Sequence, residues 1–190
     1  MDRPSTFTAF HGARRVAHGA LAEVARGLAA AAAEPGVGAG PVVLLEDATG
    51  DVVDLDLRLD PDAAAAAWRA ARTPPPSAPA GARPARGRPR LGVVAREVTL
   101  LPRHWTWLAA QPGGASAALR RLVEQASREQ APADLARQAR DARYRAMAVL
   151  AGDRPGFEEA ARALFAGDAA RFAECVAAWP ADVAAYLLRD

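Results

Sequence analysis

Residues 86–90, Arg-Gly-Arg-Pro-Arg, carry the most specific chemical signal in the sequence. Gly87 lies between Arg86 and Arg88, and its missing side chain lets the backbone lie deep in a narrow groove. Two arginines spaced in this way can extend along the floor of a DNA minor groove, where A·T tracts concentrate negative potential. Pro89 favours an extended chain, and Arg90 adds a flanking charge. The chemistry indicated is contact with A·T-rich DNA.

This run resembles the core of an AT-hook, and the residues that match it are Arg86, Gly87, Arg88 and Pro89, with Arg90 as a flank. The chain has no Lys, Asn or Ile, and all of its 24 basic residues are Arg. Such a bias is typical of GC-rich coding sequence, and it can produce the same Arg-Gly-Arg-Pro motif by chance in a linker. A minor-groove hook and a Pro/Ala/Arg-rich linker over residues 63–91 therefore both stay open.

The arginines around this motif form a basic block. Residues 63–96 contain seven Arg and no acid, whereas residues 1–62 contain ten acids and five Arg. The remainder is balanced, and the formal net charge is +2. A basic block of this kind indicates contact with a polyanion or with an acidic surface, including the acidic part of the same chain.

A second candidate site follows the linker. The pattern predicts a strand over 92–101 and helices over 103–111 and 116–127, joined by a Gly-containing turn. This arrangement resembles a ribbon-helix-helix domain, in which strands of two subunits pair and enter the major groove, which implies a homodimer. The candidate contact residues in it are Arg96, Thr99, Arg103, Arg120 and Arg121. Glu97 and Thr99 stand where that family usually has apolar residues, so an ordinary strand-helix-helix part of a core is the alternative.

The first 62 residues predict a small sheet covered by one helix. The expected elements are a hairpin over 5–18, a helix over 20–33, and strands over 42–46 and 52–59. Acidic residues between 47 and 62 could bind a divalent cation, but they lack the order of a calcium loop. Their alternation with apolar residues favours positions that face water, and we expect no metal site.

A short helix over 61–72 and a long helix over 133–150, followed by short helices, complete the prediction. The fold class is α+β, with a small N-terminal sheet, a Pro/Arg-rich linker, and then a strand followed by a mostly helical part. The expected domains are 1–62, 63–91, 92–130 and 131–190.

Catalytic motifs are not found in the sequence. His11, His18 and His104 lack metal-site spacing, and a phosphate-binding loop with its lysine cannot occur without Lys. We expect no cofactor and no catalytic residues, although an enzyme with scattered catalytic residues stays an alternative. No stretch of about 20 apolar residues and no secretory signal is visible, so no membrane span is expected and the chain is predicted to be cytoplasmic.

Residues 87–105, with 113–116 and 166–168 near Trp179 and Pro180, resemble an uncharacterised bacterial family, domain-of-unknown-function family 2239. The resemblance implies no activity. We expect a DNA-binding protein, transcription-regulating or nucleoid-associated, that contacts A·T-rich DNA as a homodimer. The alternatives are a scaffold protein whose Arg-rich segment docks on an acidic surface, and an uncharacterised enzyme.

Overall fold

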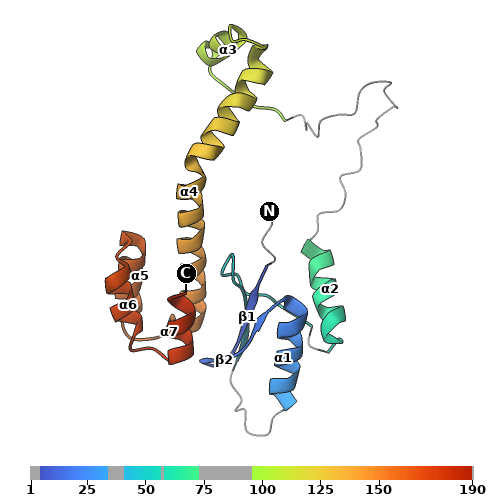
Figure 1. The fold of residues 1–190 in the computed structure, drawn as a ribbon, viewed down its shortest axis with the longest axis vertical. Coiled ribbons are helices and arrows are strands. Elements are labelled where there is room, and N and C mark those ends of the chain that lie inside the picture. The colour runs from blue at the N-terminus through green and yellow to red at the C-terminus, as the bar shows by residue number, and fades with distance from the viewer. Residues whose placement is uncertain (1–4, 34–40, 57, 73–95, 190) are drawn as a thin grey trace. The chain divides into compact units, whose positions relative to one another are not determined.

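A computed structural model describes residues 5–33, 41–56, 58–72 and 96–189 (Figure 1). The chain divides into two compact units. We call residues 1–73 with 135–190 the sheet unit and residues 74–134 the hairpin unit. The fold is α+β, with a three-stranded antiparallel sheet near the N-terminus and a mostly helical second half, as predicted.

The sheet has the order β2-β1-β3. Its strands are β1 (Phe7–His11), β2 (Arg14–Gly19) and β3 (Val42–Glu46), and both pairings are antiparallel. The predicted hairpin and the following strand are confirmed. Because β1 is the central strand, its polar backbone groups have partners on both sides, and Phe7 to Phe10 are all buried.

Both faces of the sheet are covered, and alternate residues of β1 pack on opposite sides. Helices α1 (Leu21–Ala33) and α2 (Pro61–Arg72) contribute to a first cluster of buried side chains with Phe7 and Ala9. Phe10 belongs to a second cluster, which is built mainly from the C-terminal helices. Figure 1 shows α1 and α7 on opposite sides of the sheet.

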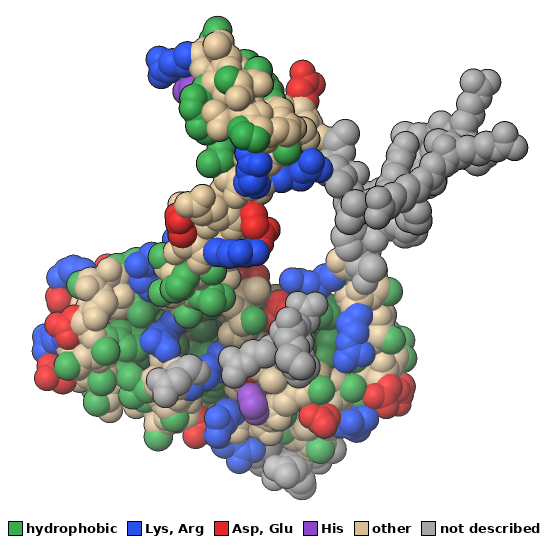
Figure 2. Space-filling view, turned by 45° about the horizontal axis from the view of Figure 1, so that its top comes forward, with side chains coloured by type: hydrophobic (Ala, Val, Ile, Leu, Met, Phe, Trp, Pro, Cys, Tyr) green, Lys and Arg blue, Asp and Glu red, His purple; other side chains and the backbone are tan. Residues whose placement is uncertain are grey.

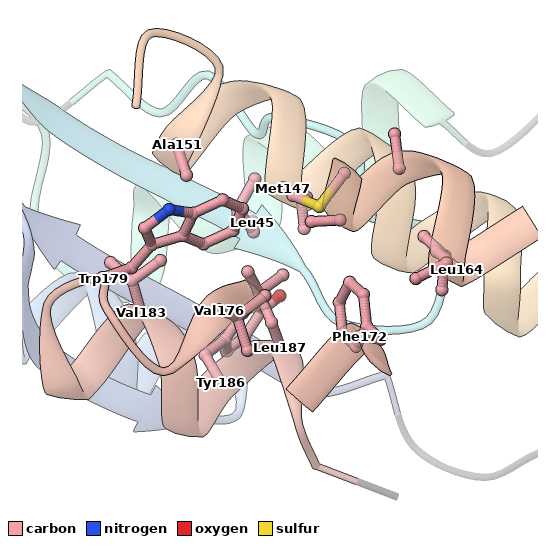
Figure 3. Close-up of a cluster of buried hydrophobic side chains, with 14 of the residues drawn as sticks. Leu45, Met147, Ala151, Leu164, Phe172, Val176, Trp179, Val183, Tyr186 and Leu187 are labelled. Atoms are coloured by element: carbon pink, nitrogen blue, oxygen red, sulfur yellow. The ribbon is translucent and has the colours of Figure 1, made fainter. Parts of the chain in front are cut away.

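The second cluster joins parts of the chain that are far apart in sequence. Helix α4 (Gly114–Ala151) contributes Met147, α5 (Phe157–Ala166) contributes Leu164, and α6 (Ala169–Val176) contributes Phe172. Helix α7 (Ala181–Leu187) adds Tyr186. Figure 3 shows these side chains gathered in one cluster with Leu45 of β3. Their burial supplies the main hydrophobic stabilisation of the sheet unit.

The predicted strand over 52–59 is wrong. Within the described residues 52–56 and 58–59, only an isolated bridge between Val52 and Leu45 forms. Further along, the backbone N–H of Arg58 donates to Asp56 Oδ1 over 3.1 Å, and the Arg58 side chain pairs with the same carboxylate. Such local side-chain contacts compete with strand pairing, so the alternating pattern does not extend the sheet.

The two helices predicted over 116–127 and 133–150 form one helix, α4, with Pro132 inside it. Proline removes one backbone donor from the helical ladder and usually ends or bends a helix. Residues 121–133 of α4 are exposed, so water can satisfy the carbonyl that loses its partner. The proline therefore does not interrupt the helix.

Candidate functional site

The described part of the hairpin unit consists of residues 96–101, α3 (Pro102–Ala109) and the first part of α4. Leu101 is the N-cap of α3, with extended φ and ψ of −65° and 148°, and Pro102 occupies the first turn. Gly113 and Gly114 have φ angles of +82° and +73°, which other residues rarely adopt. These glycines allow a sharp turn between the helices. The predicted pair of helices with a Gly-containing turn is present.

The strand predicted over 92–101 is not formed in its described part, because residues 96–101 are neither helix nor strand. Residues 92–95 lie outside the described part of the chain. A strand needs a neighbouring strand for its backbone hydrogen bonds, and within the described residues no strand pairs with this segment.

The described part of the hairpin unit has few buried side chains. Among residues 96–134, Leu108 and Ala118 are the only buried apolar side chains. Six larger ones are 42% to 63% exposed, namely Val98, Leu101, Trp105, Trp107, Leu122 and Val123. Figure 2 shows apolar side chains and arginines next to each other on this unit. A contiguous exposed apolar surface of this kind usually marks an interaction site.

The predicted contact residues that the structure describes are all exposed, and these residues are Arg96, Thr99, Arg103, Arg120 and Arg121. Arg121 Nη1 donates to the carbonyl of Pro112 over 3.2 Å. Arg120 and Arg121 follow the turn on α4, while Arg103 lies in the first turn of α3. The predicted hook residues Arg86, Gly87, Arg88, Pro89 and Arg90 lie outside the described residues.

The sheet unit contains a polar centre at Asp47, whose side chain is 10% exposed. Three donors converge on Asp47 Oδ1: Thr8 Oγ1 at 2.8 Å, Arg189 Nη1 at 2.8 Å and the Tyr186 hydroxyl at 3.1 Å. Arg189 Nη2 also donates to the Asp47 carbonyl over 3.1 Å. His18 Nε2 lies 3.4 Å from Oδ2, and no described residue donates a hydrogen bond to Oδ2.

The electrostatics of this centre favour an ionised aspartate. Burial by itself raises the pKa of Asp47, but the hydrogen bonds from Thr8 and Thr6 together with the charge and hydrogen bond of Arg189 outweigh it and hold the pKa below its ordinary value. Burial raises the pKa of Tyr186, which therefore stays protonated and donates to the carboxylate. The arrangement binds the end of α7 to the turn after β3.

Sequence reasoning missed this centre. The residues around Asp47 indicate a turn, and an aspartate in a turn is normally exposed. Its three partners are 39, 139 and 142 residues away along the chain. No local pattern predicts a contact over such separations. A cavity of about 270 Å³ adjoins the centre, lined by Asp47, Arg143, Tyr186 and Arg189 among others.

The low pKa of Asp47 makes stability pH-dependent. Its stabilising contribution is complete above the ordinary pKa of 3.8 and is lost as the pH falls through the lower pKa of the folded state. We expect the wild type to lose more free energy of unfolding than Asp47→Asn between about pH 5 and about pH 3. Urea unfolding of both proteins at the two pH values measures this. Equal losses in the two proteins would contradict the prediction that an ionised Asp47 stabilises the fold.

The described residues also bear on metal sites and on membrane-spanning helices. Among them, no three His, Cys, Asp or Glu side chains are grouped so that they could hold a metal ion. None of the described helices combines the length and apolar character needed to cross a membrane.

The protein is thus of the α+β class. Its sheet unit contains the buried polar centre at Asp47, and the described part of its hairpin unit exposes arginines and apolar side chains. A family model described as "uncharacterized protein conserved in bacteria (DUF2239)" matches residues 6–189. The chain belongs to this family, as the resemblance in its sequence predicted. Neither the curated proteins nor the solved structures contain a match.

Proposed function

We propose that this protein binds DNA and that it does so as a homodimer formed through the hairpin unit. The observation that carries the proposal is the exposed apolar surface of α3 and α4 next to exposed arginines. With only two buried apolar side chains among residues 96–134, this segment would be stabilised by a partner that covers its exposed apolar side chains.

A second copy of the chain is the partner that this segment fits best. Residues 96–101 lead directly into α3 and have no strand partner among the described residues. Two such segments, one from each copy, can pair as an antiparallel ribbon and satisfy each other's backbone groups. Val98 and Leu101 would then be covered together with Trp105 of α3.

The charges near this surface suit the phosphate backbone. Arg96, Arg103 and Arg120 form no ion pair with any described acid. In a dimer these arginines occur twice, which doubles the positive charge presented to a duplex. Glu97 is also exposed, and it would repel phosphate but can accept a hydrogen bond from a cytosine amino group.

The DNA test measures fluorescence anisotropy of labelled A·T-rich and G·C-rich duplexes with nuclease-treated protein, from about 50 to about 200 mM salt. We expect the double variant Arg120→Ala plus Arg121→Ala, which removes these two arginines from each of the two subunits, to lower affinity at least about tenfold and to reduce the salt slope by about four. The matched control is Arg162→Ala plus Arg171→Ala, which removes the same charge from exposed positions on α5 and α6. An equal loss in both variants, or none in either, would contradict the hairpin as the DNA site.

The hook is tested in the same assay. Replacing Arg86 and Arg88 with alanine should reduce the preference for the A·T-rich duplex if residues 86–90 insert into the minor groove. An unchanged preference would leave DNA binding to the arginines of residues 96–134 alone.

The dimer is tested by sedimentation. Val123→Glu places a charge on the exposed apolar surface and should convert the dimer to a monomer, because an unpaired charge in an interface is costly. Val149→Glu, at an exposed position of α4 in the sheet unit, is the control and should leave the dimer intact. A wild-type protein that sediments as a monomer at all concentrations would overturn the dimer.

A further inference from the structure

The sheet unit contains a larger cavity than the one beside Asp47. Its volume is about 480 Å³, within the range of small-molecule sites. It lies between the C-terminal part of α4, the end of α5 and the start of α6, with Leu188 at one edge. Several of the lining residues are alanines, whose short side chains leave space between the helices.

The walls of this cavity are mainly apolar. Leu164 and Phe172 form part of the cavity lining. Both are buried side chains of the second core cluster and are labelled in Figure 3. Phe165 and Leu188 also line the cavity, yet they are 50% and 44% exposed. Half-exposed apolar side chains that face a cavity would be covered by the apolar part of a ligand.

The charged groups of the lining leave an excess of one positive charge. Arg140 and Arg143 line the cavity together with a single acid, Asp168. Asp168 caps α6, because its Oδ1 accepts a hydrogen bond from the backbone N–H of Arg171 over 2.9 Å. Arg143 Nη2 donates to the backbone carbonyl of Arg189 over 2.6 Å. A guanidinium has five N–H donors, so Arg143 has further donors for a ligand.

Arg140 carries a buried donor that lacks an acceptor. Its Nε is buried and makes no hydrogen bond with any described residue, although it forms a long ion pair with Asp141 Oδ1 at 3.7 Å. The Arg140 guanidinium also lies over the ring of Phe165, with Cζ 5.3 Å from the ring centroid. An unsatisfied buried donor costs free energy unless a ligand or water accepts from it. The guanidinium therefore offers an oxyanion its donors beside an aromatic wall.

We propose that this cavity binds a small amphipathic carboxylate. The carboxylate group would accept hydrogen bonds from Arg140 and Arg143, which matches the net single charge of the lining. The aliphatic part would lie against Leu164, Phe165 and Phe172. The site goes beyond DNA binding and does not depend on it, since it is formed entirely within the sheet unit.

The test is calorimetric titration of the full chain with octanoate, neutral octanol and octylammonium, three probes with the same apolar part. We expect octanoate to bind with a Kd below about 1 mM and at least about tenfold more tightly than octanol. Octylammonium should not bind. No binding of octanoate, or equal affinity for octanoate and octanol, would overturn the proposal.

Two variants locate the site. Arg140→Gln should weaken octanoate at least about tenfold and leave octanol unchanged, because only the charged hydrogen bonds are removed. Arg162→Gln on α5 removes an exposed arginine outside the lining and should change neither affinity. If Arg140→Gln does not fold, Ala136→Phe supplies the test by filling the cavity from an exposed helix position. Unchanged octanoate affinity in the folded variant would overturn the assignment.

Discussion

Replacing Asp47 by alanine is expected to lower the free energy of unfolding by about 3 kcal/mol, because breaking a buried ion pair leaves its partners uncompensated. The variant would remove the shared acceptor of Thr8, Tyr186 and Arg189 at once. Thr8 is buried, so its hydroxyl could not turn to water. Arg189 remains partly exposed, which keeps the effect near the lower end of the range for buried pairs.

Urea unfolding of wild type and variant at neutral pH measures this loss. The matched control is Asp51→Ala in the same turn, where the carboxylate is half exposed and lies 3.7 Å from Arg145 Nη1. That variant should lose no more than about 1 kcal/mol, as exposed ion pairs contribute little. A similar loss for both variants would mean that the turn as a whole, rather than the buried carboxylate, matters.

Replacing Gly50 by alanine is expected to cost at least about 3 kcal/mol, the sum of overpacking and left-handed strain. Gly50 has a φ of +71°, and an added Cβ would collide with the backbone carbonyl oxygen of Ala142 in α4. The helix backbone cannot move away easily, because Arg145 of the same helix donates to the carbonyl of Thr49 over 2.8 Å. The turn and the helix would have to separate.

Gly12 offers a control with the same backbone conformation and no close neighbour. Its φ is +59°, and an added Cβ meets nothing within 4 Å. Gly12→Ala should therefore cost only the left-handed strain, about 1 kcal/mol. Thermal unfolding of the two variants separates the contributions. If both variants lose the same free energy of unfolding, the close approach of Gly50 to α4 adds no cost beyond the left-handed strain, which would contradict the prediction.

Local spacing was sufficient for most helices and for the sheet. Leu21, Val24 and Leu28 recur at helical spacing, and the structure buries them on one face of α1. The α+β class follows from such patterns. The family resemblance through residues 87–105 was also correct, and it is confirmed by a match over residues 6–189.

Local spacing was misleading where a neighbouring element or a local contact decides the outcome. Val53 and Leu55 alternate with acids as in a strand, yet Asp56 bonds the Arg58 backbone and no extended pairing follows. Pro132 predicts a break between two helices, but exposure of the helix around it makes the lost hydrogen bond tolerable. In the first case a competing local contact decides the outcome, and in the second the exposure of the helix does.

By itself, the sequence determined the order of helices and turns, the basic block and the arginines that are candidates for DNA contact. Only the tertiary structure decided that Asp47 is buried among Thr8, Tyr186 and Arg189, and that Arg140 faces an apolar cavity. The reason is physical. Helix and turn preferences act over a few residues, whereas these sites form when side chains from distant segments leave water together.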